Sequence, residues 1–202
     1  MLAALAHRGP DGTRGAIMGQ VALGHRRLAV IDVAGGAQPL VAGETIMVAN
    51  AEIYNFTELR AAMPGVTFAT GSDCEAALHL WRARGPQFTA SLRGMYAMAI
   101  YDRATSVLTL CRDPFGIKPL YTAKIPGGTA FASEPRALLA AGLARRELRP
   151  QARAELLQMQ FTLGRATIFP DIQRVLPGEM IRITNGAISA RDTAAILPQC
   201  RP

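Results

Sequence analysis

Short apolar runs separated by Gly and Pro turn signals make up most of the chain, and a few longer segments have helical periodicity. The apolar runs predict strands at residues 21–23, 28–31, 46–49, 95–101 and 107–111. The last two runs are almost continuously apolar, which is typical of strands that are buried on both faces. Strands and helices together predict an α+β fold with two stacked, covered sheets.

The clearest helix signal begins at the sequence Ser72-Asp73-Cys74-Glu75. Ser72 can cap the first turn, and Glu75 lies where its side chain can reach back to the amide of the cap residue. Apolar residues at 76, 77, 80 and 81 then share one face, and Gly85-Pro86 follows the last turn. Further helices are predicted over residues 56–63, 134–141 and 152–159.

The length of 202 residues suits one domain with a substantial core. No run approaches the roughly 18 uncharged apolar residues that span a bilayer, and the first residues lack the pattern of a signal peptide. We therefore expect a cytoplasmic protein with no membrane partner.

Cysteine and histidine are few and widely spaced. The three cysteines are Cys74, Cys111 and Cys200, and the three histidines are scattered, so no close pair suggests a zinc site or a disulfide framework. We expect free thiols and no metal.

The net charge of +7 raises the question of a nucleic-acid partner, and all but two of the 22 basic residues are arginine. The basic clusters are short, however, and no aromatic residues interleave with them as in a groove for single strands. An arginine-rich, solvated surface is the better interpretation, and no nucleic-acid partner is expected.

Arg27 enters an apolar segment in the sequence GHRRLAVID (24–32). Its guanidinium group must either emerge at the end of the strand or be paired, because an unpaired buried charge is costly. A guanidinium suits two parallel hydrogen bonds to a carboxylate, such as that of a free amino acid. The alternative is a surface arginine at the end of a strand.

Asn50 and Glu52 follow the strand predicted at 46–49. The Asn50 amide could donate to a developing oxyanion together with the N–H of Ala51 or Glu52, and Glu52 could bind an ammonium group. The alternative is a turn and helix cap.

Asp73, in the first turn of a helix, is stabilised by the helix dipole whatever else it does. Together these groups match a glutamine being hydrolysed at its side-chain amide.

Six ordered strings then allow a comparison with a known family: RGPDG (8–12), GHRRLAVID (24–32), NAEIYN (50–55), GSDCE (71–75), RDPFGIKPLY (112–121) and ASE (132–134), with LPGE (176–179) as a further similarity. In these strings the chain resembles the glutamine-hydrolysing domain of asparagine synthetases. The resemblance implies a class II glutamine amidotransferase domain with the N-terminal-nucleophile fold, a four-layer αββα sandwich of two antiparallel sheets.

The resemblance also implies a glutamine site. Arg27 would bind the α-carboxylate and Asp73 the α-amine, while Asn50, Ala51 and Glu52 would supply oxyanion and substrate contacts. The full set of implied pocket residues is Arg27, Leu28, Ala29, Val30, Ile31, Asn50, Ala51, Glu52 and Asp73. Ala51 stands where the family has glycine, so a positive φ there would strain the backbone by about 1–3 kcal/mol, whereas a negative φ would leave the amide free to donate.

In the family, an N-terminal cysteine attacks the amide and its own α-amine moves the proton. The sequence opens with Met1-Leu2, so we expect residues 1–186 to form the domain without its first strand and nucleophile, and to be inactive alone. Cys74 and Cys111 cannot readily substitute, because they lie inside a predicted helix and strand with no free α-amine beside them.

Residues 187–202 are expected to begin a linker toward an ATP-dependent synthetase domain, in cis or in trans. ATP and magnesium would bind in that synthetase domain. We expect no cofactor in this chain, which has no Gly-rich pyrophosphate loop. The implied function is to supply ammonia for amidation of aspartate, and a homodimer is compatible with it. The alternative is a nonhydrolytic glutamine-binding or scaffolding domain, similar to that of synthetase relatives that form a β-lactam.

Overall fold

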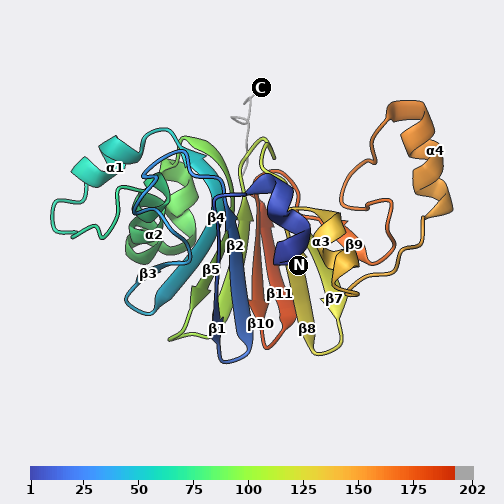
Figure 1. The fold of residues 1–202 in the computed structure, drawn as a ribbon, viewed down its shortest axis with the longest axis horizontal. Coiled ribbons are helices and arrows are strands. Elements are labelled where there is room, and N and C mark those ends of the chain that lie inside the picture. Colours follow the sequence, from blue (N-terminus) through green and yellow to red (C-terminus); the bar gives the residue numbers. More distant parts are fainter. Residues whose placement is uncertain (194–202) are drawn as a thin grey trace, which may run out of the picture.

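Antiparallel sheets and flanking helices form the structure, a computed structural model that describes residues 1–193 (Figure 1). The strands are β1 (Gly12–Met18), β2 (Val21–Arg27), β3 (Leu40–Ala42), β4 (Thr45–Ile53), β5 (Gly94–Asp102), β6 (Val107–Arg112), β7 (Tyr121–Ile125), β8 (Gly128–Ala132), β9 (Ile172–Arg174), β10 (Glu179–Thr184) and β11 (Ala187–Thr193). The helices are α1 (Phe56–Ala61), α2 (Asp73–Arg84), α3 (Pro135–Ala140) and α4 (Pro150–Met159), with 3-10 turns η1 (Leu2–Arg8) and η2 (Gly85–Ser91).

One large sheet forms the centre of the molecule, with strand order β11-β10-β6-β5-β4-β3 and antiparallel pairing throughout. The strands predicted at 95–101 and 107–111 are β5 and β6 in its middle, and most of their side chains are buried. This agrees with their continuous apolar character, since both faces of the sheet are covered.

Three apolar clusters define the layers. One lies between α2 and the large sheet, a second between the large sheet and the smaller sheets β1-β2 and β8-β7-β9, and a third beneath α3 and η1. The order is therefore helix, sheet, sheet, helix, which confirms the predicted αββα sandwich. The second sheet layer was expected as one sheet, but in residues 1–193 it is divided into a two-stranded and a three-stranded piece.

The strand predicted at 28–31 is wrong, because this segment forms a loop after β2. The pairing of β2 with β1 ends at Arg27 opposite Gly12. The Asp11 carboxylate then accepts the Ala29 N–H at 2.8 Å, which turns the backbone away from the strand direction. Leu28 and Val30 are more than 60% exposed as a result.

Helix α2 begins and ends where the sequence predicts. Ser72 Oγ accepts the Cys74 N–H at 3.3 Å, and Gly85 follows the last turn at a positive φ of 55°. The expected contact of Glu75 with the cap amide is wrong, since its carboxylate instead accepts the N–H groups of Ala69 and Thr70. Helices α1, α3 and α4 form at the three other predicted places.

The strand β11 lies past Gly186, where the linker was expected to begin. It pairs with β10 from Ala187 to Thr193 and is the outer strand of the large sheet. Residues 187–193 are therefore part of the domain, and the expected linker at 194–202 lies outside the described residues. The pattern of polar and apolar residues cannot distinguish an edge strand from an extended linker, because both carry a mixture of the two.

Candidate functional site

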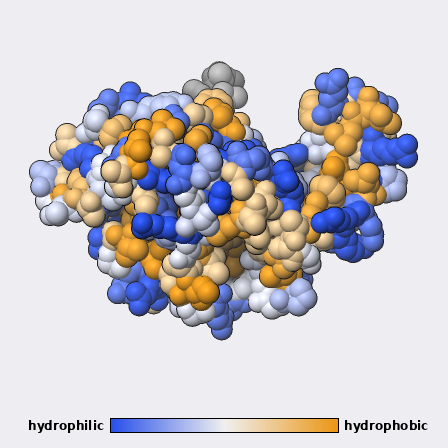
Figure 2. Space-filling view, viewed as in Figure 1, coloured by the Kyte–Doolittle hydropathy of each residue, from blue (hydrophilic) through white to orange (hydrophobic). Residues whose placement is uncertain are grey.

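A cavity of about 820 Å³ opens between β2, β8 and the second half of β4. In Figure 1, η1 lies in front of the region between β2 and β8, and the middle of the same face in Figure 2 carries both hydrophobic and hydrophilic residues. Of the nine predicted pocket residues, Ala29 does not line this cavity. The eight that do are Arg27, Leu28, Val30, Ile31, Asn50, Ala51, Glu52 and Asp73.

Along the cavity, β4 has an open edge, that is, an edge with no neighbouring strand. Strand β3 pairs with β4 only as far as Met47, and beyond it side chains bind the β4 backbone. The Gln38 side-chain amide accepts the Ala49 N–H at 2.6 Å and donates to the Ala49 carbonyl at 3.0 Å. Asp73 Oδ2 accepts the Ile53 N–H at 2.7 Å.

Ala51 lies midway between these two anchored positions. Since strand residues alternate in direction, its N–H points to the same side as those of Ala49 and Ile53, away from β5. The backbone is extended, and Ala51 is not among the positive-φ residues found in residues 1–193. The added methyl group therefore causes no backbone strain, and the amide can donate toward the cavity.

Arg27, at the end of β2, binds the loop that follows it. Its guanidinium donates to the carbonyls of Val33 at 2.9 Å, Ile31 at 3.4 Å and Asp32. A guanidinium has five N–H groups, so two remain for a ligand after these contacts within residues 1–193. Arg27 thus shapes the loop and faces the cavity at the same time.

Asp73 is 4% exposed at the first position of α2. One carboxylate oxygen accepts the Ile53 N–H, and the other lies 3.5 Å from Ser72 Oγ. The carboxylate therefore connects α2 to the open edge of β4. A negative charge at a helix N-terminus is stabilised by the helix dipole, which suits an acidic side chain at this position.

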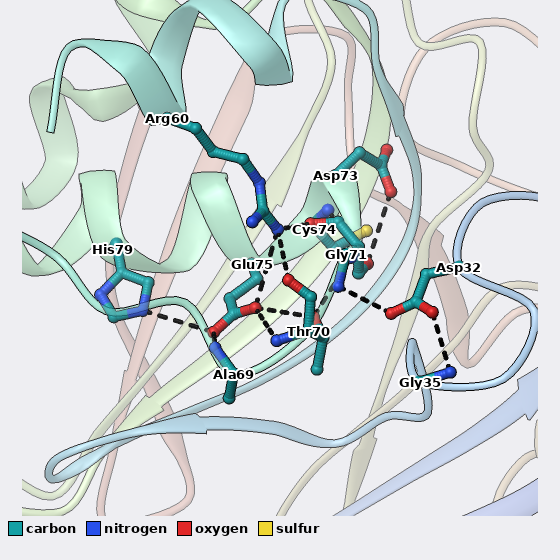
Figure 3. Close-up of polar contacts among 11 residues, drawn as sticks. Asp32, Gly35, Arg60, Ala69, Thr70, Gly71, Asp73, Cys74, Glu75 and His79 are labelled. Atoms are coloured by element: carbon teal, nitrogen blue, oxygen red, sulfur yellow. Dashed lines mark hydrogen bonds and ion pairs between the residues drawn. The ribbon is translucent and has the colours of Figure 1, made fainter. Parts of the chain in front are cut away.

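A buried carboxylate, Glu75, organises the loop that precedes Asp73 (Figure 3). It accepts hydrogen bonds from Ala69 N at 2.7 Å, Thr70 N at 2.7 Å and Thr70 Oγ1 at 2.6 Å. Arg60 and His79 complete its surroundings at 3.7 and 3.6 Å.

Burial acts to raise the pKa of the Glu75 carboxyl, but the hydrogen bonds from Thr70 and Ala69 and the charge of His79 together lower it. Arg60 also donates to the carbonyls of Thr70 at 2.8 Å and Ser72 at 2.7 Å. The role of this network could not be predicted from the sequence, because Glu75 fits a capping box equally well.

The described thiols are unsuited to attack. Cys74 lines the cavity, but burial and the nearby Asp73 charge raise the pKa of its thiol. Burial also raises the pKa of the Cys111 thiol to about 12. Because the thiolate is the nucleophile, neither side chain is reactive near neutral pH.

Residues 1–193 hold neither a metal cluster nor a membrane-spanning helix. Within residues 1–193, no three His, Cys, Asp or Glu side chains gather in a way that could bind a metal ion. None of the helices in this part of the chain has the length and apolar character to cross a bilayer.

The four-layer sandwich and the cavity at its open strand edge define an amidotransferase fold of the N-terminal-nucleophile class. The chain belongs to the glutamine amidotransferase domain family, whose model matches residues 1–193. Among solved structures, it is similar in fold to the glutamine phosphoribosylpyrophosphate amidotransferase of Bacillus subtilis, with a TM-score of 0.62 and 24% identity over 85% of this chain and 34% of that one.

Curated relatives are glutamine-hydrolysing asparagine synthetases. Asparagine synthetase 1 of Bacillus subtilis is 38% identical over 89% of this chain and 29% of its own length. Asparagine synthetase 2 of the same organism is 38% identical over 68% of this chain and 19% of its own. Asparagine synthetase B of Escherichia coli is 40% identical over 67% of this chain and 25% of its own. The chain thus spans less than a third of the length of these relatives, and the similarity confirms the predicted resemblance.

Proposed function

We propose that this chain forms the glutamine pocket of an asparagine-synthetase-type protein and serves to supply ammonia for ATP-dependent amidation of aspartate. The observation that carries the proposal is that one cavity is lined by an arginine, an acid at a helix N-terminus and an outward strand amide. These groups come from β2, α2 and β4, and they match the two ends and the reacting centre of glutamine.

Each group has a chemical role in this proposal. The two remaining N–H groups of Arg27 bind the α-carboxylate, and the acidic side chains of Asp73 and Glu52 bind the α-ammonium group. The Asn50 side-chain amide and the Ala51 N–H donate to the oxygen that becomes negative as the amide is attacked. Leu28, Val30 and Ile31 cover the methylene groups of the ligand.

The nucleophile would be carried by a segment outside residues 1–193. Within these residues β2 pairs only with β1 and β8 only with β7, so each has one unpaired edge, and both strands line the cavity. An extended segment between them would complete the second sheet and bring an N-terminal cysteine beside Ala51. The cavity volume supports this, because 820 Å³ exceeds the space that one amino acid needs. Without that segment we expect binding and no hydrolysis.

A nonhydrolytic glutamine-binding or scaffolding domain is the second candidate function. The observation that favours it is the burial of both described thiols, which raises their pKa and leaves residues 1–193 without a reactive thiolate. The two candidates differ in whether an added N-terminal cysteine segment restores ammonia release.

Calorimetry of the chain with L-glutamine, alongside an ammonia-release assay, tests the proposal. We expect the wild type to bind glutamine and Arg27→Ala to lose binding. Arg174→Ala is the matched control, because Arg174 also anchors a loop through the carbonyls of Thr162 and Gly164 but does not line the cavity. Equal affinities of the two variants would contradict the role of Arg27, and no binding by the wild type would contradict the pocket.

The remaining parts of the proposal concern partners and place. We infer an ATP-dependent synthetase domain in cis or in trans that binds ATP and magnesium, a cytoplasmic location, and an assembly compatible with a homodimer. Their support is the asparagine synthetase relatives, which are more than three times as long as the part matched here. Light scattering of the protein with its synthetase domain measures the oligomeric state.

A further inference from the structure

Asp32 occupies an unusual position in the loop that Arg27 binds. Its backbone has a positive φ of 51°, in the left-handed region that Asp and Asn tolerate better than most residues. One carboxylate oxygen accepts the Gly35 N–H at 2.9 Å, and the other accepts the Gly71 N–H at 2.7 Å (Figure 3). The second contact joins two loops that lie 39 residues apart in the sequence.

Three glycines make room for this arrangement. A Cβ atom on Gly35 would come within 2.6 Å of the Asp32 carboxylate, and one on Gly36 within 2.9 Å of the Arg27 guanidinium. A Cβ on Gly71 would lie 3.3 Å from Asp32 Cγ. A side chain at Gly35 or Gly71 would therefore displace the Asp32 carboxylate, and one at Gly36 would displace the Arg27 guanidinium.

The two joined loops carry the two ends of the pocket. The Asp32 carbonyl accepts from Arg27, so the backbone of Asp32 helps to orient the guanidinium. Gly71 is two residues before Asp73, in the loop whose other side is fixed by Glu75. We propose that Asp32 is a positioning residue that sets the separation of Arg27 and Asp73, and so the length of amino acid the pocket accepts.

This inference rests on the proposed glutamine pocket, but its structural reason is independent of the ligand. Leu28, Val30 and Val33 on the same loop are all more than 60% exposed, so apolar packing contributes little to holding the loop in place. Polar contacts to the neighbouring loop must do so instead. Asp32 supplies the contact to Gly71, and the buried Glu75 holds the loop behind Gly71 through the amides of residues 69 and 70.

Asp32→Asn is the test variant, because Asn keeps the shape and tolerates a positive φ, while its NH2 group cannot accept one of the two amides. Asp102→Asn is the matched control: Asp102 Oδ1 accepts the amides of Ala104 and Thr105 in a turn that does not line the cavity. We expect Asp32→Asn to weaken glutamine binding about tenfold in calorimetry, and Asp102→Asn to leave it unchanged. Similar melting temperatures of the two variants would show that the loss is local.

Amide exchange gives a second readout that needs no ligand. We expect the Gly71 and Gly35 amides to exchange faster in Asp32→Asn than in wild type, with no change at either amide in Asp102→Asn. Unchanged glutamine affinity in Asp32→Asn, with a wild type that binds, would overturn this inference and leave the pocket intact. A wild type that does not bind would contradict the proposed function instead, and unchanged exchange at Gly71 would then still overturn the role of Asp32.

Discussion

Glu75→Gln is the substitution for which the structure makes the sharpest prediction. Glu75 is 3% exposed and accepts two backbone amides and one hydroxyl from residues 69 and 70. Glutamine has nearly the same shape, but it removes the charge and replaces one acceptor oxygen by an NH2 group. At least one backbone N–H would then face another donor across a hydrogen-bond distance.

The expected cost can be worked from these contacts. Hydrogen bonds to a charged group contribute about 1.5–3 kcal/mol each, and removing one partner of a buried ion pair costs about 3–5 kcal/mol. Because glutamine retains one acceptor, we expect a loss near the lower end, about 3 kcal/mol in the free energy of unfolding. For a chain of this size that corresponds to a melting temperature lower by about 6–12 °C.

Urea denaturation followed by tryptophan fluorescence is a direct assay. Trp81 is the single tryptophan of the sequence, and it packs edge-on against Phe88 at 5.3 Å on the helix that carries Glu75. Glu58→Gln is the matched control, since Glu58 is 63% exposed in its pair with Arg93. The control should change the unfolding free energy by less than about 1 kcal/mol.

The difference in the free energy of unfolding between Glu75→Gln and wild type should also depend on pH. Burial acts to raise the pKa of Glu75, but hydrogen bonds and His79 lower it below the ordinary 4.5. A carboxyl group with a lowered folded-state pKa stabilises the protein above its unfolded pKa and loses this contribution as pH falls through the folded value. The stability gap should therefore be full near pH 7 and narrow below about pH 4.5. A loss under about 0.5 kcal/mol at pH 7 would refute the reasoning.

Two further predictions concern the lining of the cavity. Ala51→Gly should leave glutamine affinity unchanged in calorimetry and lower stability by about 0.5–1 kcal/mol, because Ala51 is extended and glycine weakens a strand; a marked gain in affinity would show that the methyl group obstructs the ligand. The protein should become less stable as pH falls below 6.5, because the pKa of His25 is lowered in the folded state. Burial is the largest cause, the hydrogen bond with the Ala49 backbone raises the pKa, and the charge of Arg27 lowers it. The unfolded state then binds more protons, so the free energy of unfolding falls by up to about 1.4 kcal/mol per pH unit. Urea midpoints at pH 7.5 and 5.5 should therefore differ less in His25→Gln than in wild type.

The candidate site divides into parts that the sequence could predict and parts that it could not. Arg27, Asn50 and Asp73 stood out as polar groups at the boundaries of apolar segments, and the cavity brings all three together. Gln38 was missed, because its contact with Ala49 joins a loop to a strand edge and leaves no local pattern. The loop at 28–31 was predicted as a strand, because apolar residues in a loop cannot be distinguished by composition from a short buried strand.

What the sequence determined by itself is the set of locally encoded elements. Strands β5 and β6 follow from continuous apolar runs and α2 from its cap and apolar stripe, because such patterns reflect interactions between near neighbours in the chain. What only the tertiary structure decided is how distant segments meet. The extended backbone at Ala51, the contact of Asp32 with Gly71 and the open edge of β4 depend on packing between segments far apart in sequence, and backbone groups in such contacts are satisfied by partners that no local pattern specifies.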